Sequence, residues 1–188
     1  ARSGAAPDVL TLVLGGVKAG KSGFARRLAE QTGRPVTMLA TGVVGDEEML
    51  RRVQAHRRER PQDWRLVEEP LDIGRAAGSE AEVVLLDSVD SWLFNRLEER
   101  GGAGAEFTPD LERELVDSCD QGLDQLASGR HLIAVSAEVG LSLIANSAYG
   151  RAFTDLLGML NQRLAAWADE CYLVISGIPV PLHTFRGR

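Results

Sequence analysis

Short apolar runs, each ending at a small or polar residue, dominate the hydrophobic pattern of this chain. The five strongest are VLTLVL (9–14), PVTMLAT (35–41), AEVVLLDS (81–88), HLIAVS (131–136) and CYLVISG (171–177). Runs of this length and composition favour strands buried on both faces, as in a parallel sheet. Two weaker runs, WRLVEE (64–69) and PVPLHTF (179–185), predict a further strand and a short C-terminal strand partner.

Segments with helical spacing lie between these runs. One passes through Phe24, Leu28 and Gln31 and stops near Gly33, and others are predicted over 45–60, 89–100, 108–128 and about 148–169. Thr108 as N-cap and Pro109 at the first helical position mark one start. The segment RGGAGAEF (100–107) predicts a flexible loop. Strands alternating with helices predict an α/β fold with a mostly parallel, doubly wound sheet.

Length and composition bound the function classes. We expect one α/β domain over residues 9–188, preceded by a flexible leader (1–8) that lacks the apolar stretch of a signal peptide. A formal net charge of −6 argues against general nucleic-acid binding. No apolar run approaches the roughly 20 residues of a membrane span. Two cysteines are too few for a disulfide framework or a zinc site, which favours a cytoplasmic location.

The segment after the first predicted strand, GGVKAGKS, matches the phosphate-binding P-loop pattern G-x-x-x-x-G-K-[ST]. Its glycines let backbone N–H groups surround a phosphate, and Lys21 would reach the β- and γ-phosphates. Ser22 would bind Mg²⁺. The chain holds 21 Lys and Arg residues, and only Lys18 and Lys21, both in this loop, are lysines. A lysine here therefore indicates a place that arginine does not fill.

A P-loop protein needs an acid for the metal ion. Asp87, which closes VVLLD, is the first candidate, and Glu138, just past HLIAVS, is the second. Switch GTPases use an N-K-x-D motif, and no lysine exists outside the P-loop. A small-molecule kinase or a nucleotidyltransferase is therefore favoured.

A local basic cluster, RRVQAHRRER (51–60), surrounds His56 in this acidic chain. A neutral histidine can attack phosphorus and form a labile N–P intermediate. Arg57, Arg58 and Arg60 would disfavour protonation of His56 and stabilise phosphate charge. From the residues alone, a solvated helix face or partial burial of His56 remains an open alternative.

The whole set of motifs resembles one family. GGVKAGKS, MLATG (38–42), RVQAHRRERPQDWRLVEEP (52–70), VVLLDSVDSWLFN (83–95), SAEVG (136–140) and GMLNQRLAAWADECYLVISGIPV (158–180) occur in the order found in bifunctional adenosylcobinamide kinase/adenosylcobinamide-phosphate guanylyltransferases of cobalamin biosynthesis. The resemblance spans about residues 10–180. It implies a RecA-like P-loop NTPase architecture and a homotrimer.

The resemblance also assigns residues. It implies that His56 accepts GMP from GTP. It places nucleotide contacts at Gly15, Gly16, Val17, Lys18, Ala19, Gly20, Lys21, Ser22, Ala40, Thr41, Gly42, Arg57, Arg58, Glu59, Arg60, Glu68 and Asp87. Ser22 and Asp87 are the expected Mg²⁺ ligands.

The implied chemistry has two steps. A nucleoside triphosphate, ATP or GTP, phosphorylates adenosylcobinamide, and GMP then passes from GTP through His56 to adenosylcobinamide-phosphate, giving adenosylcobinamide-GDP. Two alternatives stay open: a simple P-loop kinase without the guanylyl-enzyme step, and a non-catalytic nucleotide-binding module. The chain departs from the family at Lys18-Ala19, at Ala137 and between Ser142 and Ala145. These departures leave open whether both activities persist.

Overall fold

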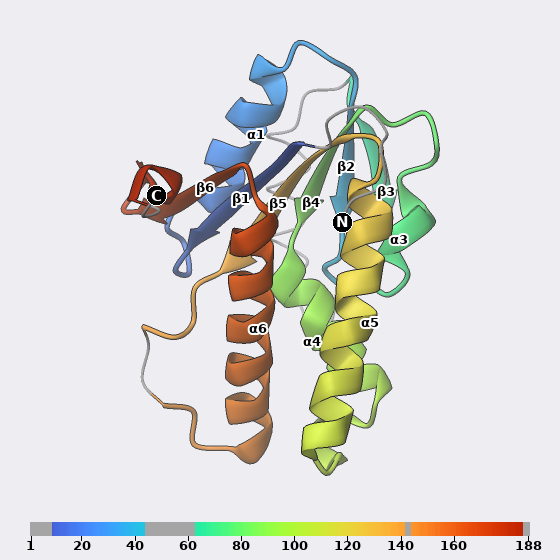
Figure 1. Ribbon diagram of the computed structural model, residues 1–188, viewed down its shortest axis with the longest axis vertical. Coiled ribbons are helices and arrows are strands. Elements are labelled where there is room, and N and C mark those ends of the chain that lie inside the picture. The colour runs from blue at the N-terminus through green and yellow to red at the C-terminus, as the bar shows by residue number, and fades with distance from the viewer. Residues whose placement is uncertain (1–8, 44–62, 142–143, 186–188) are drawn as a thin grey trace.

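The computed structural model describes residues 9–43, 63–141 and 144–185. The expected leader (1–8) and the expected helix over 45–60 lie outside these described residues. Seven strands in the described part form one sheet in the order β3-β2-β4-β5-β1-β6-β7 (Figure 1). They are β1 (Val9–Gly15), β2 (Val36–Ala40), β3 (Arg65–Glu68), β4 (Val83–Asp87), β5 (His131–Ala137), β6 (Glu170–Ile175) and β7 (Ile178–Pro181).

All neighbouring strands are parallel except β6 and β7, which pair antiparallel. The predicted strands are confirmed, and the ends of all but the last differ by at most two residues. The last predicted strand is shorter than expected because its second half forms a 3₁₀ turn, η2 (Leu182–Phe185). The doubly wound, mostly parallel sheet with a C-terminal strand pair is thus the fold that the sequence predicts.

The helices connect successive strands. They are α1 (Lys21–Gln31), α3 (Ile73–Ala76), α4 (Val89–Glu99), α5 (Pro109–Ala127) and α6 (Ala148–Trp167). Thr108 caps α5 as predicted, because its hydroxyl oxygen accepts a hydrogen bond from Leu111 N. No helix in the described residues combines the length and the apolar content needed to cross a bilayer.

Two short elements differ from the sequence-based expectations. Helix α3 was not predicted, since four residues carry too little periodicity to be recognised. The expected flexible loop after α4 contains a 3₁₀ turn, η1 (Gly102–Gly104), which begins after Gly101 in a left-handed conformation (φ 103°). The Gly104 amide donates to Gly101 O over 3.1 Å, which closes this turn.

The central strands are apolar on both faces because each face is covered by helices. Alternate side chains of β1 point to opposite sides, with Leu10, Leu12 and Leu14 in the larger core and Val13 in the smaller one. Helix α1 packs over β1, β4 and β5 on the smaller side. Helices α3, α4, α5 and α6 cover the other side.

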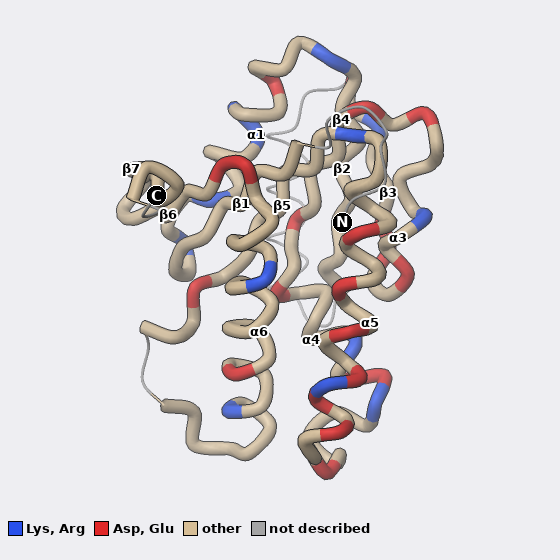
Figure 2. Tube along the Cα trace, viewed as in Figure 1, with Lys and Arg blue, Asp and Glu red and all other residues tan. Residues whose placement is uncertain are grey.

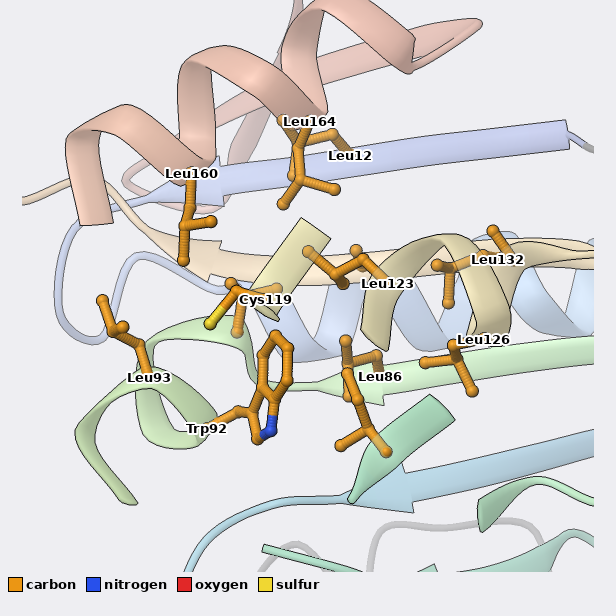
Figure 3. Packing of buried hydrophobic residues seen from close by; sticks show 14 of the residues in the cluster. Leu12, Leu86, Trp92, Leu93, Cys119, Leu123, Leu126, Leu132, Leu160 and Leu164 are labelled. Carbon is orange, nitrogen blue, oxygen red and sulfur yellow. The ribbon is translucent and has the colours of Figure 1, made fainter. Parts of the chain in front are cut away.

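The larger core is built between the sheet and three long helices (Figure 3). Trp92 and Leu93 of α4 face residues of α5 and α6 such as Cys119, Leu123 and Leu160, and all five are at most 1% exposed. Fully burying such side chains contributes about 1.5–3 kcal/mol each. This packing fixes α4 and α6 relative to the carboxyl edge of the sheet, beyond which their free ends project (Figure 1).

Candidate active site

A tight loop links the end of β1 to α1 at the carboxyl edge of the sheet. The Ala19 amide donates to Gly16 O over 3.2 Å, and the Phe24 amide donates to Gly20 O over 3.1 Å as the helix begins. Gly20, the N-cap residue, has no side chain to satisfy the first amides of α1. Unpaired amides at a helix N-terminus, together with its positive dipole end, bind anions. The loop therefore has the geometry of a phosphate cradle.

Two glycines of this loop are required by its backbone. A Cβ on Gly15 would lie 2.5 Å from the carbonyl oxygen of Val174 on β6, well inside van der Waals contact. Gly20 adopts φ 98°, a left-handed conformation that residues with a Cβ rarely adopt. The loop is also tied to the β6–β7 turn, because the Gly177 amide donates to Ala19 O over 2.9 Å.

The Lys21 side chain folds back over this loop. Its ammonium group donates a 2.8 Å hydrogen bond to Gly16 O. Burial lowers the pKa of Lys21 below its ordinary value, and the nearby carboxylates of Asp90 and Asp87 act in the opposite direction. A half-buried ammonium held inside an amide-lined loop is placed to contact phosphate oxygens.

Predicted site residues from three neighbouring strands meet at the same edge. Ala40, the last residue of β2, stands in register with Asp87 on β4 and with Glu68 on β3. Thr41 follows directly and is fully buried, and its hydroxyl donates to Ser88 O (2.7 Å) and accepts from Ser88 N (2.9 Å). Gly42 comes next in the chain and is exposed. The fold thus gathers these residues and the phosphate cradle, Gly15 to Ser22, along one edge.

Asp90 is a residue of this edge that the sequence-based analysis missed. It lies in the first turn of α4, and its Oδ1 accepts a 3.0 Å hydrogen bond from the Ala137 amide at the end of β5. The next amide, that of Glu138, donates to Gly15 O over 3.0 Å. Asp90 therefore holds the segment that flanks the first residue of the cradle. The only feature of the sequence that could have indicated Asp90 is its position three residues after Asp87.

Asn161 is a second residue that the analysis missed. Its amide nitrogen donates to Ala137 O over 2.9 Å, and its Oδ1 accepts from the buried Ser136 hydroxyl over 2.7 Å. Asn161 is 6% exposed on the face of α6 that carries Leu157, Leu160 and Leu164. A polar residue at helical spacing among buried leucines was the signal that could have found it.

The second candidate acid, Glu138, turns toward its own loop, where its Oε1 accepts from the Gly140 amide over 2.8 Å. The predicted residues His56, Arg57, Arg58, Glu59 and Arg60 lie outside the described residues.

The described residues fit a magnesium–nucleotide complex better than a metal bound by protein alone. No group of three or more His, Cys, Asp or Glu in the described ranges could hold a metal ion. Mg²⁺ commonly takes one or two protein oxygens and completes its shell with water and substrate phosphates. Ser22 lies at the second residue of α1, and the Asp87 carboxylate lies near enough to Lys21 to affect its pKa. These two oxygen donors suit that arrangement.

Comparisons with known proteins identify relatives over almost the whole chain. The family model described as cobinamide kinase / cobinamide phosphate guanyltransferase matches residues 11–182. The chain is 38% identical over 174 residues to the bifunctional adenosylcobalamin biosynthesis protein CobP of Pseudomonas aeruginosa, covering 91% of this chain and 95% of that protein. It is 34% identical over 181 residues to the bifunctional adenosylcobalamin biosynthesis protein CobU of Escherichia coli (strain K12), covering 93% and 99%.

A solved structure supports the fold independently of these sequences. An ATPase from the type III secretion system of pathogenic bacteria superposes with a TM-score of 0.56 at 10% identity. The match covers 88% of this chain but 52% of that ATPase chain, so this chain spans about half its length. At this identity the likeness concerns the P-loop NTPase fold alone.

Proposed function

This chain belongs to the cobinamide kinase / cobinamide phosphate guanyltransferase family, and we propose that it joins the two activities through a guanylylated His56. It is a bifunctional enzyme of cobalamin biosynthesis, a kinase and a guanylyltransferase. The proposal concerns which of its residues perform each step.

The first step transfers the γ-phosphoryl group of ATP or GTP to the hydroxyl of adenosylcobinamide. The bond between the γ-phosphorus and the bridging oxygen breaks, and the nucleoside diphosphate leaves. A new bond forms to the acceptor oxygen, whose proton passes to water. The cradle amides and Lys21 bind the phosphates and stabilise the charge that builds up on the leaving oxygens. Ser22 and Asp87 would hold Mg²⁺, which would supply positive charge to neutralise the phosphates.

The second step transfers GMP. A neutral nitrogen of His56 attacks the α-phosphorus of GTP, the bond to the bridging oxygen breaks, and pyrophosphate leaves. A phosphate oxygen of adenosylcobinamide-phosphate then attacks the same phosphorus, the N–P bond breaks, and adenosylcobinamide-GDP forms. In this proposal Arg57, Arg58 and Arg60 bind the triphosphate and the departing pyrophosphate. Ala40, Thr41, Gly42, Glu59, Glu68 and Asp87 complete the nucleotide site.

The observation that carries the proposal is the position of Lys21. Its ammonium group lies over the cradle, next to Gly16 O, at the edge where β2, β3 and β4 present Ala40, Glu68 and Asp87. Open α/β sheets bind their ligands outside the carboxyl ends of the strands, which is this edge. The matching family model runs through residue 56.

A product assay tests the proposal. The protein is incubated with Mg²⁺, GTP and adenosylcobinamide, and the corrinoid products are identified by mass spectrometry. We expect adenosylcobinamide-GDP, and only the phosphate ester when His56→Ala replaces the wild type. Lys21→Ala is expected to lower the first step by about 100-fold or more. A wild type that stops at the phosphate ester is a simple kinase, and one that forms no product is a binding module.

Assembly and location extend the proposal. We propose a homotrimer in the cytoplasm, by analogy with the family. Light scattering coupled to size-exclusion chromatography would give a mass of three chains, and a monomer or dimer would contradict the homotrimer. Fractionation of the source cells would test the location.

A further inference from the structure

Four exposed apolar side chains lie on segments that follow the carboxyl ends of β1, β4 and β5, the edge that also holds the phosphate cradle, and we propose that they bind the corrin macrocycle of the acceptor substrate. They are Val17 (80% exposed), Phe94 (45%), Leu141 (85%) and Ile144 (84%), called the apolar rim below. This inference rests on the proposed function, because it assumes that the acceptor is a corrinoid.

The rim residues come from three connections that all follow carboxyl ends of parallel strands. Val17 lies in the cradle after β1, Phe94 on α4 after β4, and Leu141 and Ile144 between β5 and α6. Figure 1 shows that α4 and the connection after β5 both extend past the edge of the sheet at which the cradle lies. The rim residues and Lys21 therefore lie on the same side of the sheet edge.

The ring of Phe94 is held in place although it is exposed. It packs edge to face against Tyr149 (centroids 6.2 Å apart) and Phe153 (6.5 Å) on α6. The Tyr149 hydroxyl donates to Glu98 Oε1 over 2.5 Å, and Tyr149 also lies 5.9 Å from the ring of Phe107. A fixed apolar surface loses little conformational entropy when a ligand covers it.

Nucleotide phosphates do not explain this surface. Phosphates need amides and cations, which the cradle supplies, whereas exposed apolar side chains grouped at one site favour a ligand with apolar area. A corrinoid has a broad macrocycle with two apolar faces and a hydroxyl at the end of one side arm. That hydroxyl must reach the γ-phosphate near Lys21, so the macrocycle must lie within one side arm of the cradle. The apolar rim lies on segments that leave the same edge of the sheet as the cradle.

Charge on the adjoining surface favours the same ligand. A cobalt(III) corrinoid with an alkyl ligand carries a net positive charge. Glu98 accepts a hydrogen bond from Tyr149, and Glu106 precedes Phe107 in the chain. Figure 2 shows acidic residues along α5, with basic residues among them near the end of α4. Glu98 therefore presents negative charge to a cation at the Phe94 end of the rim, whereas Arg151, which donates to Ala145 O, lies at the Ile144 end.

The test uses cobinamide itself, followed by its visible absorbance in equilibrium dialysis without nucleotide. Leu141→Ser with Ile144→Ser changes two nearly fully exposed positions, so the fold is retained, and Phe94→Ala removes the fixed ring. Phe185→Ala is the matched control, because Phe185 is 74% exposed and follows β7, whose last residue, Pro181, pairs with Tyr172 in the middle of the sheet rather than at its carboxyl edge. GTP affinity and molar mass are measured on every variant.

We expect the rim variants to bind cobinamide at least about tenfold more weakly, with GTP affinity within about twofold of wild type and Phe185→Ala unchanged. Wild-type cobinamide affinity in both rim variants would overturn the inference. So would rim variants that change only the molar mass, since the rim would then be a contact between copies of the chain. If the wild type forms adenosylcobinamide-GDP in either case, the proposed function stands and this inference alone fails.

Discussion

The backbone amide of Ala137 donates a 3.0 Å hydrogen bond to the Asp90 carboxylate, which ties the end of β5 to the first turn of α4. Asn161 of α6 holds the carbonyl of the same residue over 2.9 Å. The amide of the next residue, Glu138, pairs with Gly15 O. Two helices thus fix the strand end that flanks the P-loop, so the packing of α4 and α6 helps to determine the position of that loop.

Asp90→Ala is expected to destabilise the fold by about 1–3 kcal/mol, because it leaves the half-buried Ala137 amide without its acceptor. Urea unfolding measures this change. Asp155→Ala, at an exposed position on α6, is the control and should change the free energy of unfolding by no more than about 0.5 kcal/mol. Equal stability of the two variants would mean that water replaces the Asp90 contact without cost.

Gly15→Ala is expected to lower stability by about 2 kcal/mol or more and to abolish nucleotide binding. The new Cβ would meet Val174 O at 2.5 Å, and only a shift of β1 or β6 relieves this overlap. Thermal unfolding with and without GTP gives both effects. Gly16→Ala is the matched variant for stability, because nothing lies within 4 Å of its added Cβ, and its unfolding temperature should stay near that of the wild type. Similar losses in both variants would contradict this explanation.

Burial raises the pKa of the Cys119 thiol from an ordinary 9.0 to about 12. Above about pH 9 the unfolded chain therefore releases this proton while the native protein retains it. Stability then falls with rising pH, by up to about 1.4 kcal/mol per pH unit from this group, until the native thiol also ionises. Below about pH 8 the group makes no difference to the pH slope.

Unfolding in urea between pH 9 and about pH 11 measures this effect, with Cys119→Ala as the comparison. The variant is less stable overall because it leaves a cavity, but its stability should decline less steeply with pH. Parallel declines in the two proteins would show that Cys119 does not contribute to the alkaline loss.

The sequence predicted the elements of this fold better than their arrangement. The runs ending at Gly15, Asp87 and Ala137 identify strands, because buried parallel strands are continuously apolar. Nothing in those runs shows that β1 lies between β5 and β6. Gly15 lies close to Val174 only because β1 is next to β6 in the sheet. The P-loop motif therefore predicts a glycine at position 15, but the close approach of Val174 O, a second reason for that glycine, is known only from the structure.

The candidate site, like the fold, could be predicted only in part. The cradle and Asp87 were predictable because a local pattern carries them. Asp90 and Asn161 were not, because both act on the backbone of Ala137, a partner that no spacing in the sequence reveals. The polar bonds of Thr41 with Ser88 likewise depend on β2 and β4 being neighbours. Residues whose contacts are distant in the sequence can be identified only once the order of the strands in the sheet is known.

The central claim is that His56 carries GMP. The most direct test incubates the protein with Mg²⁺ and GTP labelled at the α-phosphate, followed by denaturing electrophoresis, beside His56→Ala and a sample labelled only at the γ-phosphate. We predict an acid-labile α-label on the wild type that is absent from His56→Ala and from the γ-labelled sample. An unlabelled wild type that still binds GTP, or a label that persists in His56→Ala, would contradict the guanylylated histidine.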